Sequence, residues 1–111
     1  MSDKVSSVPE IFDNIDKGFD PSKAEGVDAI FQFNLTGDNG GQYWVKVADR
    51  QADVHEGTHD DPTMVITSTA DDYIALVNGE LNPMTAFMQG KVKVKGDMGL
   101  ALKLQAMFGL G

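Results

Sequence analysis

The chain has 111 residues, of which 41% are hydrophobic and 23% charged, a composition typical of one folded domain and not of a disordered segment. It contains no cysteine, which excludes disulfides, thiol nucleophiles and cysteine-ligated metal centres. Its formal net charge of −8 repels phosphate backbones and argues against nucleic-acid binding. We therefore expect a single domain spanning residues 1–111.

The N-terminal segment predicts an amphipathic helix that Ser7 caps and that Gly18 and Pro21 end. Its apolar residues recur at spacings of three and four, which places them on one helical face. These residues are Val8, Ile11, Phe12, Ile15 and Phe19. A short turn over residues 21–25 follows.

Residues 28–68 predict four strands. Apolar and polar side chains alternate in residues 28–36 and again in 42–48, and the glycine-rich segment between them predicts a hairpin. Residues 52–56 and 63–68 are shorter segments of the same kind. We expect these strands to form a meander.

The next segment predicts two helices and a fifth strand. Thr69 caps the first helix and Gly79 ends it, whereas the second begins at Asn82-Pro83 and ends at Gly90. Residues 91–95 alternate lysine with valine, which is typical of an edge strand protected by charge.

The last predicted helix begins after Asp97 and reaches about Phe108. Beyond its first residue only Lys103 and Gln105 are polar, so the helix is apolar nearly all around. Such a helix needs cover on two sides. Neighbouring helices, a protein partner, a membrane or an apolar ligand would each provide the second cover.

The charge is unevenly distributed along the chain. Residues 1–80 hold 16 acids and five bases, a net of −11, whereas residues 81–111 hold one acid and four lysines, a net of +3. Two interpretations fit: the basic, apolar C-terminal third makes transient contact with an anionic membrane surface or lipid head group, or its lysines are ordinary solvated side chains.

The sequence His55-Glu56-Gly57-Thr58-His59 matches the H-E-x-x-H pattern of zinc peptidases. That chemistry requires a helix, but Gly57 lies at the centre of the motif and Asp60-Asp61-Pro62 follows it directly. A polar turn between strands is the better interpretation.

Other catalytic patterns are absent from the sequence. There is no G-x-S-x-G segment, and Asp71-Asp72 complements a helix N-terminus better than it forms an acid–base pair. We expect no enzyme activity, no catalytic residue, no metal site and no cofactor.

Residues 81–98, LNPMTAFMQGKVKVKGDM, form a short helix, a lysine-rich strand and a Gly-Asp helix cap before the apolar last helix. This run resembles the characteristic segment of the sterol carrier protein 2 family, and the order of elements is similar from about Ala29 to Phe108. The resemblance implies an α+β fold. It would have a five-stranded, mostly antiparallel sheet, covered on one face by about five helices, with an apolar tunnel between sheet and helices.

The implied function is non-enzymatic binding and transport of a fatty acid, fatty acyl-CoA or sterol. The alternatives are a protein–protein interaction module and an accessory domain that presents acyl thioesters to a partner enzyme. With no secretory leader, no transmembrane run and no peroxisomal tripeptide at the end, we expect a stand-alone cytoplasmic protein that is a monomer or weak dimer.

We expect the lipid to be lined by apolar side chains of the sheet, the two middle helices and the last helix, each of which would serve equally well as ordinary core. Trp44 is included although strand alternation allows it either face. The candidate lipid-contact residues are Phe33, Trp44, Ile74, Val77, Met84, Phe87, Met88, Met98, Leu102, Leu104, Met107 and Phe108.

Overall fold

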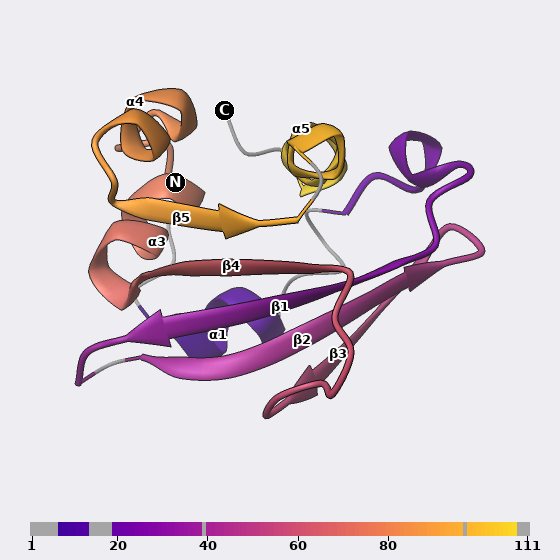
Figure 1. The fold of residues 1–111 in the computed structure, drawn as a ribbon, viewed down its shortest axis with the longest axis horizontal. Coiled ribbons are helices and arrows are strands. Elements are labelled where there is room, and N and C mark those ends of the chain that lie inside the picture. Colours follow the sequence, from indigo (N-terminus) through magenta and orange to yellow (C-terminus); the bar gives the residue numbers. More distant parts are fainter. Residues whose placement is uncertain (1–6, 14–18, 39, 97, 109–111) are drawn as a thin grey trace.

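The computed structural model describes residues 7–13, 19–38, 40–96 and 98–108. It is an α+β structure in which one five-stranded sheet carries helices (Figure 1). The elements are α1 (Val8–Asp13), the 3-10 helix η1 (Pro21–Ala24), β1 (Ala29–Thr36), β2 (Gly41–Ala48), β3 (Gln51–Glu56), β4 (Met64–Thr69), α3 (Ala70–Val77), α4 (Pro83–Met88), β5 (Val92–Lys95) and α5 (Met98–Phe108). The end predicted for the first helix falls on residues 14–18, which lie outside the described part of the chain; the other bounds agree with the sequence expectations to within a few residues. Ile15 and Asp97 lie outside the described residues.

The strand order is β3-β2-β1-β4-β5, and three of the four pairings are antiparallel. This confirms the expected mostly antiparallel sheet and the edge position of β5. The expected meander is wrong, however, because β4 leaves β3 and pairs in parallel with β1, so that Phe33 lies beside Ile66. The segment after β3 crosses the sheet to reach the side of β1 that β2 does not occupy (Figure 1).

Local sequence explains where the strands and helices turn. Asp49 and Arg50 between β2 and β3 both have positive φ, at 53° and 60°, as a two-residue type I′ hairpin requires. Thr69 caps α3 by accepting a hydrogen bond from the N–H of Asp72 at 3.1 Å. Asn82 caps α4 in the same way, accepting from Met84 at 2.9 Å and from Thr85 at 3.1 Å.

The core lies on the face of the sheet that carries Phe31, Phe33 and Leu35 of β1. Helix α1 covers part of this face: the Phe12 ring stacks on Tyr43 at 4.2 Å and meets Phe33 edge-on at 5.3 Å. The Tyr73 ring of α3 meets Phe33 edge-on as well, with the ring centroids 5.7 Å apart. Such aromatic contacts add to the stabilisation that comes from burial alone.

Phe31→Ala tests whether this face is a packed core. Phe31 is fully buried, so its truncation should lower the free energy of unfolding by about 3–5 kcal/mol, from lost burial and from the cavity left behind. Chemical denaturation measures the change. Gln51→Ala, at an exposed position in β3, is the control and should change it by less than about 0.5 kcal/mol. Equal effects of the two changes would contradict the packing described.

Tyr73 predicts how stability depends on alkaline pH. Burial raises the pKa of the Tyr73 phenol well above its ordinary value of 10.0, because the ionised form is poorly solvated in the core. The unfolded chain therefore loses this proton first, and the free energy of unfolding falls as pH rises above about 10, by at most about 1.4 kcal/mol per pH unit for this group.

Tyr73→Phe should make that fall less steep when denaturation is followed from about pH 9 to about pH 11. Tyr43→Phe is the matched control. Burial, followed by the nearby Glu56 and Asp13, also raises the pKa of Tyr43, but this side chain is only half-buried and its effect should be smaller. If the free energy of unfolding fell equally steeply with pH in Tyr73→Phe and in the wild type, the Tyr73 phenol would ionise as readily in the folded protein as in the unfolded chain.

Candidate functional site

The candidate lipid-contact residues divide into an inner and an outer group. The side chains of Phe33, Leu104 and Met107 are buried in the core, with Ile74 and Val77 of α3 packed partly buried against it. The outer group consists of large apolar side chains that water reaches: Met84 is 58% exposed, Phe87 40%, Met88 79% and Leu102 59%.

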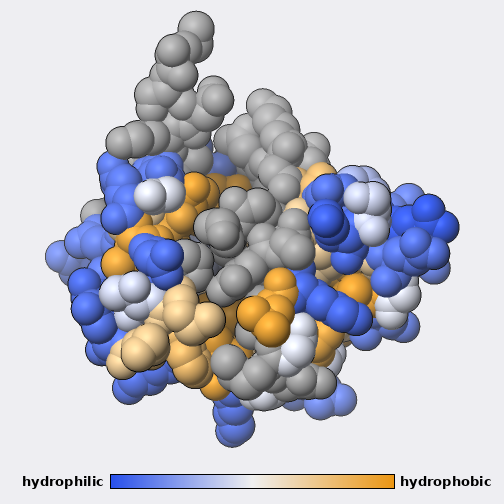
Figure 2. Space-filling model, turned by 90° about the horizontal axis from the view of Figure 1, so that it is seen from above, coloured by the Kyte–Doolittle hydropathy of each residue, from blue (hydrophilic) through white to orange (hydrophobic). Residues whose placement is uncertain are grey.

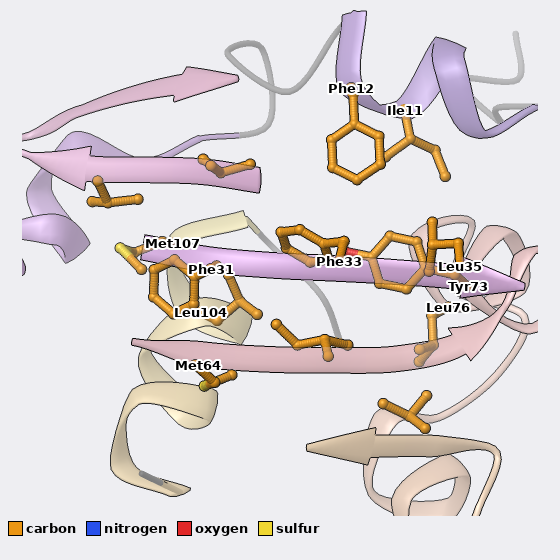
Figure 3. Close-up of a cluster of buried hydrophobic side chains, with 14 of the residues drawn as sticks. Ile11, Phe12, Phe31, Phe33, Leu35, Met64, Tyr73, Leu76, Leu104 and Met107 are labelled. Carbon is orange, nitrogen blue, oxygen red and sulfur yellow. The ribbon is translucent and has the colours of Figure 1, made fainter. Parts of the chain in front are cut away.

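Figure 3 shows β1 running through the core from one cluster of apolar side chains to another. At one end, Leu104 and Met107 of α5 lie near Phe31 and Met64. At the other end, side chains of α1 and α3 gather around Leu35. Phe33 lies between the two clusters, so Phe33, Leu104 and Met107 share one side of the sheet.

The outer group on α4 reverses the usual amphipathic pattern. Ala86 is fully buried, whereas Met84, Phe87 and Met88 project outward. The helix is held by its Asn82 cap and, after it ends, by a hydrogen bond from the Lys91 N–H to the carbonyl oxygen of Ala86 at 2.9 Å. Hydrophobic atoms are accordingly visible on the side of the molecule that α4 and α5 occupy (Figure 2).

Helix α5 is buried along one side and exposed along another. Leu104 and Met107 are buried, while Leu102 and Lys103 are exposed. Near its end, the Met107 carbonyl accepts a hydrogen bond from the Asp20 N–H, which precedes η1, at 2.6 Å. The side chains of the other two candidates on this helix, Met98 and Phe108, lie outside the described residues.

Trp44 does not join the other candidates. It pairs with Gln32 across the β1–β2 ladder, and both side chains point to the face opposite Phe33. There the indole stacks on His55 at 4.1 Å and meets His59 edge-on at 4.8 Å. Trp44 therefore packs against two imidazole rings on the outer face, away from the apolar core.

The outer face also holds a buried amide that sequence analysis did not single out. Gln32 accepts a hydrogen bond from the His59 N–H at 2.7 Å, and its Nε2 donates to the carbonyls of Tyr43 at 3.2 Å and Gly57 at 3.1 Å and to Asn34 Oδ1 at 3.2 Å. These bonds satisfy the buried side chain and hold the loop after β3 on the sheet. A glutamine in the middle of a central strand was the available signal.

The structure places the H-E-x-x-H letters on a strand and a loop and not on a helix. His55 belongs to β3, and His59 follows it in the loop, where its Nδ1 accepts a hydrogen bond from the Asp61 N–H at 3.0 Å. In the described part of the chain, no three His, Asp or Glu residues gather closely enough to hold a metal ion. The geometry of a zinc peptidase is therefore not formed here.

A surface pocket of about 490 Å³ lies between the segment after η1 and the β2–β3 hairpin. Five of its eight residues are charged, which makes it unsuitable for an apolar chain. Its lining residues are Glu25, Gly26, Val27, Asp28, Lys46, Ala48, Asp49 and Arg50.

Within the described residues, no helix has the length and apolar character that crossing a bilayer requires.

Comparison with known proteins places this arrangement in a family. Residues 12–109 match the model of the SCP-2 sterol transfer family. Hydroxysteroid dehydrogenase-like protein 2 of Homo sapiens is 33% identical over 105 residues, which cover 94% of this chain and 25% of that protein. Its counterpart in Xenopus laevis is 33% identical over 109 residues, covering 97% and 26%. This chain thus spans about a quarter of these curated relatives.

Solved structures of similar length agree. Sterol Carrier Protein 2 of Yarrowia lipolytica, in its apo form, has a TM-score of 0.73 and 32% identity over 97% of this chain and 95% of its own. The solution structure of palmitated SCP2L2 from Aedes aegypti has a TM-score of 0.75 and 29% identity, covering 93% and 95%. Because the family model covers most of the sequence and the fold is similar to these structures over most of the chain, the chain belongs to the SCP-2 sterol transfer family.

Proposed function

We propose that the protein is a cytoplasmic carrier that holds one fatty acid, fatty acyl-CoA or sterol between the sheet and helices α3, α4 and α5, and leaves its cargo chemically unchanged. Family membership supports lipid binding in general. The finer proposal rests on one observation: large apolar side chains on α4 and α5 stand exposed beside a core that is apolar throughout this side of the sheet.

In this proposal the inner and outer groups have different roles. Phe33, Ile74, Val77, Leu104 and Met107 contact the lipid chain. The exposed Met84, Phe87, Met88 and Leu102 form the entrance and close over the lipid when it is bound. Met98 and Phe108 remain proposed contacts. Methionine suits this role because its flexible, polarisable side chain adapts to guests of different shape.

Burial of the chain provides enough free energy for this function. A sixteen-carbon tail contributes roughly 12 kcal/mol at about 0.8 kcal/mol per methylene, whereas immobilising it costs at least about 4 kcal/mol. The difference permits micromolar or tighter binding without a specific polar anchor. The carrier should therefore discriminate by length and volume more than by head group.

Two further observations support the proposal. The palmitated protein of Aedes aegypti shares this fold, which favours an acyl chain among the candidate ligands. In addition, both histidines of the chain pack against Trp44 on the opposite face from the apolar core. A lipid bound on the core side would thus be separated from both imidazoles by the sheet.

A second candidate function follows from the curated relatives. They carry a segment similar to this chain within a protein about four times as long, named as hydroxysteroid dehydrogenase-like. An accessory domain that presents lipid to an enzyme on the same or a separate chain would use the same apolar site. It differs from a free carrier only in where the cargo is delivered.

Phe87→Asp tests the proposed entrance. A carboxylate there would have to lose water beside the lipid, so affinity for a fluorescent fatty acid should fall at least tenfold. The thermal midpoint should change little, because Phe87 is already 40% exposed. The control, Gln51→Asp, adds the same charge to an exposed position on β3 and should keep wild-type affinity.

Native mass spectrometry of gently purified protein provides the independent measurement, since a carrier should retain lipid from its source. Protein that contains no lipid and takes up neither fatty acid, acyl-CoA nor sterol would contradict the proposal. Uptake unaffected in folded Phe87→Asp would instead contradict the assignment of α4 to the entrance.

A further inference from the structure

We propose that Met84 and Met88 of α4 form a paired site of reversible methionine oxidation by peroxide. Oxidation converts each thioether to a sulfoxide, and methionine sulfoxide reductases restore it. The consequence for lipid uptake rests on the proposed function, in which both side chains belong to the entrance. The site itself rests on separate observations, namely the exposure, the spacing and the chemistry of the methionines.

Exposure divides the described methionine side chains into two classes. Met88 is 79% exposed and Met84 is 58% exposed, whereas Met64 is 1% exposed and Met107 is 0% exposed. The two buried side chains lie in the apolar core (Figure 3). A peroxide dissolved in water therefore reaches the side chains on α4 and is kept from those of the core.

The two exposed methionines are neighbours on one helix. Met84 and Met88 are four residues apart in α4. Side chains at this spacing lie on the same face of an α-helix, with their Cβ atoms about 5–6 Å apart. The site is therefore a pair of thioethers on one surface, which a peroxide or a reductase can approach from the same direction.

The chain directs a peroxide to methionine because it contains no cysteine, whose thiolate would react as well. In the reaction, a lone pair of the thioether sulfur attacks one oxygen of hydrogen peroxide, and the O–O bond breaks. A sulfoxide forms, and the second oxygen leaves as water after a proton transfer. The sulfur loses two electrons and the peroxide gains them. In the repair, two thiols of a reductase become a disulfide while the sulfoxide oxygen leaves as water.

The fold accepts sulfoxides at these two positions. Helix α4 is anchored by the buried Ala86, by the Asn82 cap and by the hydrogen bond from the Lys91 N–H to the Ala86 carbonyl. None of these contacts uses a methionine side chain. A sulfoxide at Met64 or Met107 would instead place a strongly polar oxygen in the apolar core. The folded protein therefore tolerates oxidation of the exposed pair.

In the proposed carrier, oxidation of the pair weakens lipid binding. The sulfoxide oxygen is a hydrogen-bond acceptor that water solvates well, and it must lose this water when Met84 and Met88 close over a lipid. The apolar side chains of Phe87 and Leu102, which we also place at the entrance, carry no donor that could replace the water. Peroxide thus lowers the affinity of the carrier for its cargo, and repair restores it.

Peptide mass spectrometry after graded treatment of the whole protein with hydrogen peroxide tests the site. We expect Met84 and Met88 to be oxidised at least about tenfold faster than Met64 and Met107, because only the first two are exposed. The thermal midpoint should change little once both sulfoxides have formed. Methionine sulfoxide reductases A and B, one for each sulfoxide epimer, should then return both peptides to their original mass. Equal oxidation rates at the exposed and buried positions would overturn the inference, as would unfolding when only the exposed pair is oxidised.

Uptake of a fluorescent fatty acid tests the consequence. Wild-type protein that carries both sulfoxides should bind at least about tenfold more weakly than untreated protein, and repair should restore the affinity. In Met84→Leu/Met88→Leu, which has no thioether at the site, the same treatment should leave the affinity unchanged. Each protein is compared with its own untreated form, so any effect of leucine itself on binding cancels. The matched control, Met64→Leu, replaces a buried thioether at similar volume and should stay as sensitive to peroxide as the wild type.

A loss of affinity that persists in peroxide-treated Met84→Leu/Met88→Leu would overturn the inference, because another residue would then be responsible. Met1 and the side chain of Met98 lie outside the described residues, and both methionines remain in this variant. Undiminished uptake by wild-type protein with both sulfoxides would overturn the inference too. If untreated wild-type protein takes up no lipid, the proposed carrier function fails, whereas the order of oxidation and its repair still decide whether the site exists.

Discussion

The central strand β1 has no free edge, because it pairs with β2 on one side and β4 on the other. Different kinds of interaction hold the side chains on its two faces. Phe33 is held on the core face by the rings of Phe12 and Tyr73, whereas Gln32 on the outer face is held by hydrogen bonds to the loop that contains His59. Apolar burial and amide hydrogen bonding therefore fix the same strand from opposite sides, and the other elements take their positions from it.

This arrangement separates the chemistry of the molecule into two sides. The buried side chains that we propose as lipid contacts, Phe33, Leu104 and Met107, lie on the helix-covered face, while the indole and both imidazoles lie on the other. The backbone of the sheet stands between them. In the proposed function the lipid contacts only the first side, so the outer face is free to stabilise the loop that crosses it.

Helix α4 shows how a fold can keep large apolar side chains in water. The Asn82 cap and the hydrogen bond from Lys91 to Ala86 hold both ends of the helix through its backbone. Burial of Ala86 completes the attachment, so Met84, Phe87 and Met88 are not needed to anchor it. The proposed lipid entrance depends on this exposure, because side chains buried in the core could not form an opening at the surface.

The sequence by itself determined the secondary-structure elements, their caps and the family, because a cap such as Thr69 or the alternation in β5 depends on residues only a few positions apart. It also grouped Phe33, Leu104 and Met107, which do share a core, whereas their role as lipid contacts stays a prediction. Only the tertiary structure decided that β4 pairs with β1, that Trp44 faces away from Phe33, and that α4 turns its methionines outward. Each of these three features depends on register between segments far apart in the chain, which local periodicity does not reveal.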